Sequence, residues 1–158
     1  MRSFLALIFA SLWIGASLLL AGSVAPVAFG TLASQEMAGA VIGHVLRTVF
    51  VSGFLGGVIL TGVELQGGLP AGRNARVAFA VVWASACGIA RYVMTPRIDE
   101  IRRAIGGPID ALARDDARRV AFDRMHGAIV GVFGLAIVAA AVVVVLQVIA
   151  ARPRISTS

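Results

Sequence analysis

Two histidines and three internal methionines are the side chains best suited to bind a metal ion or haem. Each lies close to where a hydrophobic stretch of the chain begins or ends. Imidazole and thioether groups together suit Cu(I), and paired imidazoles suit haem iron. Methionine also commonly fills gaps in apolar packing at such positions. The candidate ligands of copper or haem are His44, His126, Met94 and Met125.

The two histidines are expected at similar depth in a membrane. His44 is about 7 Å along a helix expected for residues 39–63, and His126 directly precedes the last hydrophobic stretch. Glycines spaced four residues apart lie beside each histidine and let helix backbones approach closely. These pairs are Gly39 with Gly43 and Gly127 with Gly131. The second and fourth helices could therefore bring both imidazoles to a shared site.

Two arginines lie inside hydrophobic stretches, where a central charge costs about 2.5–3.5 kcal/mol on insertion scales. Arg47 is about 12 Å along the second stretch, and Arg91 is close enough to the end of the third to reach the interface. Such residues are functional candidates by default. The alternative is a pairing of either arginine with an acid at the same end. The available acids are Glu36, Asp99 and Asp123.

Catalytic motifs are absent from the sequence. It contains no Gly-x-Ser-x-Gly, Walker loop, His-Glu-x-x-His or Gly-x-Gly-x-x-Gly pattern. Cys87 is the single cysteine, which excludes an intramolecular disulfide and a cluster of cysteine ligands. The sequence therefore favours a protein that is not an enzyme and leaves the question of catalysis open.

Four hydrophobic stretches must position these side chains, because each is long enough to cross a membrane. A helix needs about 20 apolar residues to cross the hydrocarbon core. The fourth stretch holds four consecutive valines, which would suit a strand in water, but in lipid a helix satisfies its own backbone hydrogen bonds. We predict an all-α fold in which residues 1–158 form a single domain, a four-helix up-down bundle in the membrane. The expected spans are about 3–29, 39–63, 77–94 and 127–151.

The composition also excludes other classes of protein. The chain is 59% hydrophobic and 14% charged, whereas a soluble domain is about 25% charged. Intrinsic disorder and a basic nucleic-acid-binding domain are both excluded by these values. Seven arginines and six acids lie between residues 97 and 124. That segment is nearly neutral and is not a polybasic tail.

Residues 95–126 form the one substantial polar segment, and their pattern is helical. Thr95 can act as an N-cap with Pro96 at the first helical position, and Gly106 stops this helix. Pro108 then starts a second helix, whose apolar residues recur at helical spacing up to the fourth span. We predict an amphipathic helical segment between spans three and four, on the bilayer surface or against the span ends.

Two questions of topology stay open. The basic residue and apolar run at the N-terminus also resemble a signal peptide, but Pro26 would follow the cut and the run is long for one. Outside the spans, five arginines lie on the side of the termini and seven on the other, which favours a cytoplasmic location for the second side. Arg2, before the first span, favours the opposite orientation.

Several short motifs occur in an order that resembles one family. They are Trp13-x-Gly15, Ala25-Pro26-x-Ala28-Phe29, Ala38-Gly39-x-x-x-Gly43, Tyr92-x-Met94-Thr95-Pro96-Arg97-Ile98 and Phe122-x-x-Met125-His126. From about residue 10 to 145, the chain resembles the family carrying domain of unknown function 4149, which is similar to the transmembrane-protein-205-like proteins. The resemblance implies four membrane spans and no established activity. His126 matches the family pattern, whereas Met125 stands in place of a leucine and His44 in place of an apolar residue.

In layout alone, the chain is similar to copper-resistance-D-like membrane proteins and to protoporphyrinogen oxidases that bind haem through histidine. Such a likeness concerns arrangement and carries no site. We expect a small non-enzymatic integral membrane protein, a multi-pass protein of a bacterial inner membrane. Its expected partners are the lipid bilayer and, through glycine-rich helix faces, further copies of the chain. Two alternatives are a haem- or copper-binding protein for redox or metal handling that uses His126, with or without His44, and a small-solute transporter that acts as an oligomer.

Overall fold

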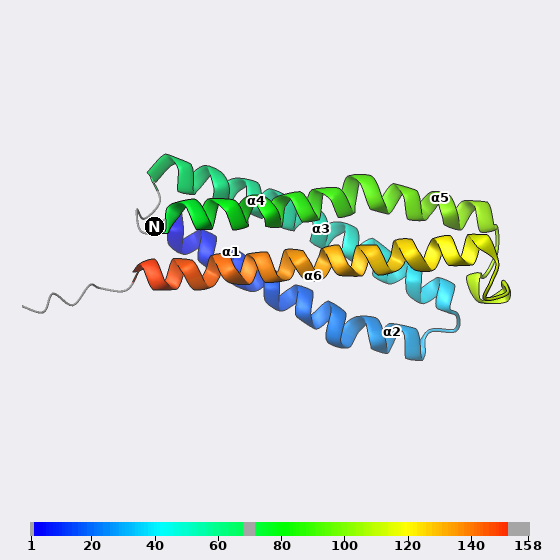
Figure 1. Ribbon diagram of the computed structural model, residues 1–158. Helices are drawn as coiled ribbons and strands as arrows, with labels where there is room; N and C mark the ends of the chain where they lie inside the picture. Colours follow the sequence, from blue (N-terminus) through cyan, green and yellow to red (C-terminus); the bar gives the residue numbers. More distant parts are fainter. Residues whose placement is uncertain (1, 68–71, 152–158) are drawn as a thin grey trace, which may run out of the picture.

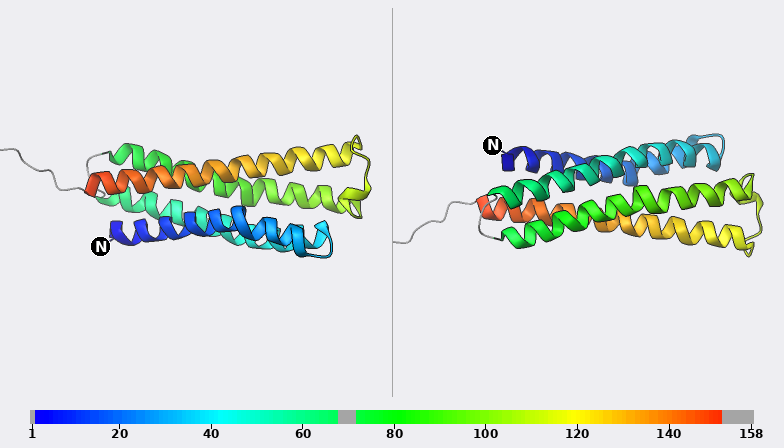
Figure 2. Two further views of the ribbon diagram at one scale, coloured as in Figure 1. Left: turned by 90° about the horizontal axis from the view of Figure 1, so that it is seen from below. Right: turned by 90° about the horizontal axis from the view of Figure 1, so that it is seen from above.

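The computed structural model describes residues 2–67 and 72–151, which form four long helical rods joined by short connections (Figure 1, Figure 2). The described residues contain no strand, so the predicted all-α four-helix fold is confirmed. Two rods include a short π-helical stretch. The elements are α1 Arg2–Leu19, η1 Leu20–Val24, α2 Ala25–Thr31, α3 Gln35–Gly67, α4 Arg73–Ile89, η2 Ala90–Met94, α5 Thr95–Ile105, η3 Ile109–Ala111 and α6 Ala117–Ala151.

Each rod is long and apolar enough to span a membrane. The four candidate spans have 28 to 35 residues, which corresponds to about 42–53 Å against a hydrocarbon core of about 30 Å. Their outward faces carry large apolar side chains such as Leu12, Ile59 and Val138, which are 68%, 63% and 60% exposed. An apolar surface of this extent is matched by lipid rather than by water. The chain is therefore a multi-pass membrane protein whose helices extend beyond the hydrocarbon core.

The rods pack in a ring in which the backbone of each one lies closest to two neighbours. Both α3 and α6 lie against α1 and α4, so α3 and α6 are diagonal to one another. An aromatic cluster fills the centre of the ring. The ring centroids of Trp13 and Trp83 are 5.1 Å apart, and those of Phe50 and Phe133 are 5.5 Å apart. The indole N–H of Trp13 also donates a hydrogen bond to the carbonyl of Val49 at 2.9 Å, which ties α1 to α3.

Close packing of α3 depends on two glycines in its middle. A Cβ added at Gly53 would lie 2.6 Å from the Sγ of Cys87. A Cβ added at Gly57 would lie 2.9 Å from both the Cβ and the backbone nitrogen of Ala84. Glycine at these positions therefore lets the α3 backbone approach α4 more closely than any other residue would.

The glycine pairs beside the histidines do not bring α3 and α6 together, contrary to the prediction. A Cβ added at Gly43, Gly127 or Gly131 would meet no atom within 4 Å. The physical reason is the diagonal placement of α3 and α6 in the ring. Gly39 does allow a close approach, but its neighbour is the side chain of Arg102 from α5.

Each π-helical stretch lies directly before a turn that contains proline. Proline lacks an N–H, and its ring collides with the carbonyl four residues earlier in an α-helix. The wider π turns accommodate Pro26 and Pro96, so both rods continue past them. The prediction that Thr95 is an N-cap is therefore wrong. Its hydroxyl donates to the carbonyl of Ala90 at 2.7 Å within the continuing rod.

The connection between α5 and α6 is less helical than predicted. α5 ends at Ile105, and the φ of 68° at the following Gly106 lies in the left-handed region that favours glycine. The helix predicted to start at Pro108 is absent: Pro108 is followed only by the three-residue η3, and α6 begins later, at Ala117. Asp116 caps α6 by accepting a hydrogen bond from the backbone N–H of Arg118 at 2.8 Å. The amphipathic segment is thus split between α5, which extends span three, and residues 117–126, which extend span four.

The two hairpins, α1–α3 and α4–α6, diverge toward one end of the bundle. Figure 1 shows them close together where α1 begins and α6 ends, and apart where α2 and α5 end. The charged residues of α5 and of the start of α6 lie at the diverging end. A site between the hairpins is therefore built at this end.

Candidate functional site

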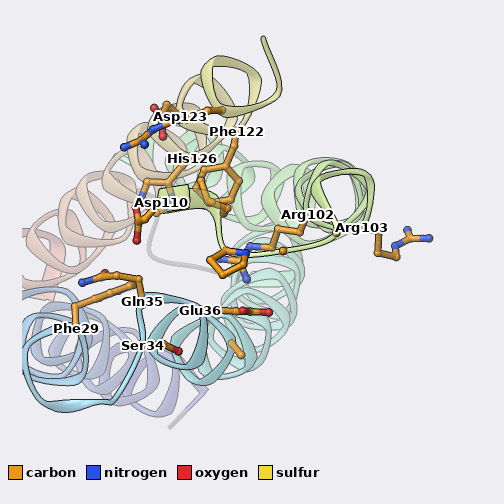
Figure 3. Close-up of a pocket in the computed structure, with 16 residues that line it drawn as sticks. Phe29, Ser34, Gln35, Glu36, Arg102, Arg103, Asp110, Phe122, Asp123 and His126 are labelled. Carbon is orange, nitrogen blue, oxygen red and sulfur yellow. The ribbon is translucent and has the colours of Figure 1, made fainter. Parts of the chain in front are cut away.

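A cavity of about 580 Å³ lies between the two hairpins at the diverging end (Figure 3). One wall comes from the α2–α3 connection and the start of α3. The other wall comes from the end of α5, the loop that follows and the start of α6. The lining residues are Phe29, Ser34, Gln35, Glu36, Ala40, Arg102, Arg103, Gly106, Gly107, Pro108, Ile109, Asp110, Arg119, Phe122, Asp123 and His126.

Arg102, in the last turn of α5, is held at the cavity by two neighbours. Its guanidinium carbon lies 5.3 Å from the centroid of the Phe122 ring, a cation–π contact. A Cβ at Gly39 would lie 2.8 Å from its Nη2, so glycine leaves room for the guanidinium. Its Nε is buried, and the guanidinium makes no hydrogen bond or ion pair with any described residue.

The other arginines of the lining are engaged with backbone. Arg119 donates from Nη1 to the carbonyl of Leu112 at 2.8 Å. Arg103 donates from Nε to the carbonyl of Asp99 at 3.3 Å, and Figure 3 shows its side chain directed away from the cavity. Three carboxylates complete the charged lining, and none forms an ion pair within the part of the chain that is described. They are Glu36, Asp110 and Asp123.

Only one of the two candidate histidines lines the cavity. His126 lines the cavity, where its ring stacks on Phe122 with centroids 5.9 Å apart and 10° between the planes. His44 is exposed on α3 and is not among the lining residues. Both α3 and α6 line the cavity, but it contains one of the two imidazoles rather than both.

The candidate methionines lie away from the cavity lining. Met94 and Met125 are partly buried and pack against the hydrophobic core. Over residues 2–67 and 72–151, no group of three or more His, Cys, Asp and Glu side chains is placed to hold a metal ion. Binding of copper or haem by His126, His44, Met125 or Met94 stays a prediction, and of the four only His126 faces the cavity.

The two arginines within the spans have different surroundings. Arg47 pairs with Asp99 at 2.6 Å, with side chains 41% and 36% exposed, and this links α3 to α5. The structure thus contains the ion pair that was the alternative to a functional role for Arg47. Arg91 lies with its guanidinium carbon 5.4 Å from the ring centroid of Tyr92. Its Nε is buried without a hydrogen-bond partner among the described residues.

A second polar site, which sequence reasoning missed, lies at the opposite end of the bundle. Arg76 donates from Nε and Nη2 to Oε2 of Glu64, at 3.0 and 2.8 Å. Gln147 donates from Nε2 to Oε1 of Glu64 at 2.5 Å. Glu64 and Arg76 are fully buried, and Gln147 is 5% exposed. This buried cluster of Glu64, Arg76 and Gln147 joins α3, α4 and α6.

The buried cluster had one usable signal in the sequence. Gln147 is the only polar residue in the hydrophobic stretch 127–151. Glu64 and Arg76 fall outside the expected spans 39–63 and 77–94, in a segment whose glycines and proline favour a loop. In the structure α3 continues to Gly67 and α4 begins at Arg73, so both residues lie on helices.

Comparison with known proteins finds a family without a described activity. Residues 8–106, more than half of the chain, match the family described as "Domain of unknown function (DUF4149)". The match supports the resemblance drawn from the motifs for that family, and it does not extend to the transmembrane-protein-205-like proteins. It includes Gly39 and Arg102 but ends before Phe122 and His126. Neither the comparison with curated proteins nor that with solved structures gives a match.

Proposed function

The chain belongs to the family described as domain of unknown function (DUF4149), and we propose that it is a non-enzymatic protein of a bacterial inner membrane that binds an amphiphilic molecule. The observation that carries the proposal is the cavity of about 580 Å³ between the hairpins. Small-molecule sites commonly have volumes of roughly 300–1,000 Å³ and combine apolar walls with a few polar groups. This cavity combines Phe29, Ile109 and Phe122 with charged side chains, which suits a ligand that has both kinds of surface.

The lengths of the helices support a position of the cavity at the depth of lipid head groups. The apolar residues 127–151 of α6 extend over about 38 Å, enough to cross a hydrocarbon core of about 30 Å. The preceding turns, residues 117–126, are charged and therefore lie outside that core. Phe122 and His126 belong to these turns and line the cavity. A bound amphiphile can keep its polar part there and its apolar part in lipid.

The single hydroxyl group at the cavity caps a helix, which favours a binding role for the cavity over nucleophilic catalysis. Ser34 is the single hydroxyl residue of the lining. Its Oγ accepts a hydrogen bond from the backbone N–H of Met37 at 3.1 Å, so it serves as a cap of α3. A nucleophile needs a hydrogen-bonded base instead.

Filling the cavity with a large side chain tests the proposal. Ala40 lines the cavity, so Ala40→Trp reduces its volume, whereas Ala78→Trp adds the same ring to an exposed position on α4 near the buried cluster. Purified proteins are stripped of lipid, incubated with membrane lipids and weighed intact by native mass spectrometry. We expect the unsubstituted protein and Ala78→Trp to retain one amphiphile per chain, and Ala40→Trp to lose it. Equal retention by all three proteins would refute the proposal.

A further inference from the structure

The charges of the cavity indicate which head group it binds. We infer, on the basis of the proposed function, that the ligand is a phospholipid whose head group carries both a phosphate and an amine, and that Arg102 binds the phosphate. Three observations carry the inference: the unused donors of Arg102, the contacts that hold its side chain, and the balance of charge around the cavity.

The guanidinium of Arg102 has hydrogen-bonding capacity that no described residue uses. A guanidinium carries five N–H donors, and a buried polar atom without a partner requires an explanation. The Nε of Arg102 is such an atom, and the side chain makes no ion pair within the described chain. The fork of donors on a guanidinium matches the oxygens of a phosphate. An anionic oxygen in the cavity would satisfy these donors.

Arg102 is also held in place before any ligand binds. Phe122 stacks against its guanidinium at 5.3 Å, and Gly39 leaves the space that its Nη2 occupies. A side chain that is already positioned loses less conformational entropy when a ligand binds. Arg103, one residue along the same helix, is exposed and directed away from the cavity (Figure 3). The two neighbouring arginines thus provide a binding candidate and a matched control.

The remaining charges favour a head group with both signs. Apart from Arg103, which is directed away, the lining contains two arginines and three carboxylates. Glu36, Asp110 and Asp123 would repel a ligand that is only anionic, and each can accept hydrogen bonds from an amine. A net-neutral head group with a phosphate and an amine complements this lining, and its acyl chains would extend into the adjacent lipid.

A panel of four ligands tests the inference on the full-length protein in detergent. The ligands are phosphatidylethanolamine, phosphatidylglycerol and diacylglycerol with identical acyl chains, and soluble phosphoethanolamine. Apparent affinities are measured by native mass spectrometry for the unsubstituted protein, Arg102→Gln, Arg102→Lys and Arg103→Gln. Thermal unfolding of each variant separates loss of binding from loss of fold. Arg102→Lys keeps the positive charge but removes the forked donors of the guanidinium.

We expect phosphatidylethanolamine to bind more tightly than the other three ligands. Arg102→Gln should weaken its binding by about 10-fold or more, as for loss of hydrogen bonds to a charged group. Arg102→Lys should be intermediate, and Arg103→Gln should change the affinity by less than about twofold, as for an exposed charge. Diacylglycerol binding should be the same in all variants.

Several results would overturn the inference. Equal affinity for phosphatidylethanolamine and diacylglycerol, or no effect of Arg102→Gln, would remove the phosphate contact. Tighter binding of phosphatidylglycerol would remove the role of the amine. Tight binding of phosphoethanolamine alone would point to a soluble ligand. In the first two cases the proposed binding of an amphiphile survives. A soluble ligand, or the absence of binding by every ligand with no effect of Ala40→Trp on lipid retention, would refute the proposed function itself.

Discussion

Arg76 and Glu64 form an ion pair that is sealed from the surroundings, with two guanidinium nitrogens 2.8 and 3.0 Å from one carboxylate oxygen and both side chains fully buried. Gln147 binds the other oxygen of the carboxylate. Burial of two charges is compensated only when their geometry is good and their remaining valences are satisfied. The cluster joins three helices at one end of the bundle, while at the other end the hairpins part around the cavity. At one end of the molecule the helices are therefore joined by buried polar contacts, and at the other end a cavity separates the hairpins.

The buried cluster should contribute strongly to stability. Glu64→Gln removes the negative charge that pairs with the fully buried Arg76 and should lower the free energy of unfolding by about 3–5 kcal/mol. Gln147→Leu leaves Oε1 of Glu64 without this donor and should cost about 1–3 kcal/mol. Unfolding is measured by denaturant titration in mixed detergent micelles. Gln66→Leu, at an exposed position near the same end, is the control and should change the free energy by less than about 0.5 kcal/mol. A Glu64→Gln protein as stable as the control would show that the ion pair does not hold the bundle.

Glycine at position 57 should be required for packing rather than for flexibility. The Cβ of Gly57→Ala would meet backbone atoms of Ala80 and Ala84 at 3.0 and 2.9 Å, which cannot move independently of α4. We expect a loss of about 1–3 kcal/mol in the free energy of unfolding. Gly131→Ala is the matched substitution at an open position, where alanine gains helix propensity and should be neutral or stabilising. Equal effects at the two positions would contradict the close contact of α3 with α4.

The cap of α6 should be sensitive to acid. Hydrogen bonds from the side chain and backbone of Arg118 lower the pKa of Asp116 from 3.8 to about 2. Because the folded pKa is depressed, the stabilising contribution is present above the ordinary value and is lost as the pH falls through about 2. An NMR titration of the Asp116 carboxyl carbon should show a midpoint near 2. Arg118→Gln should raise that midpoint toward the ordinary value, and an unchanged midpoint would show that Arg118 does not interact with Asp116 in solution.

The sequence predicted which segments form helices more reliably than it predicted which helices pack side by side. Length and apolar character predicted four membrane helices, because lipid requires every backbone group to be satisfied within a helix. The same reasoning could not give the order of the helices in the ring. Both histidines were expected at similar depth, yet His126 lines the cavity and His44 does not. The order of the helices in the ring depends on how they pack, including the close approach of α3 to α4 at Gly53 and Gly57.

The site was predictable at one end of the bundle and not at the other. Charge between residues 97 and 124 indicated the end that contains the cavity, and His126 was correctly associated with that end. The buried cluster was missed because its three members come from segments far apart in the sequence. Glu64 and Gln147 are separated by 83 positions, and only the fold makes them neighbours.

The positions of the histidines give a clear expectation for haem and copper. The protein is expressed with both supplied, and the purified protein is examined by visible absorption and by metal analysis. We expect any bound haem or copper to be lost in His126→Ala and retained in His44→Ala, because only His126 faces the cavity. Loss in His44→Ala would contradict this assignment. A wild-type protein that holds neither haem nor copper would remove the haem- and copper-binding alternative.

The central claim is that an amphiphile occupies the cavity between the hairpins, and photochemical labelling in native membranes tests it most directly. A phosphatidylethanolamine with a photoreactive group near its head group is cross-linked, and the labelled peptides are identified by mass spectrometry. We predict labels on both cavity walls, within residues 29–40 and 102–126, and their loss in Ala40→Trp but not in Ala78→Trp. Labels spread evenly over the lipid-facing helices, and unchanged by Ala40→Trp, would contradict the account.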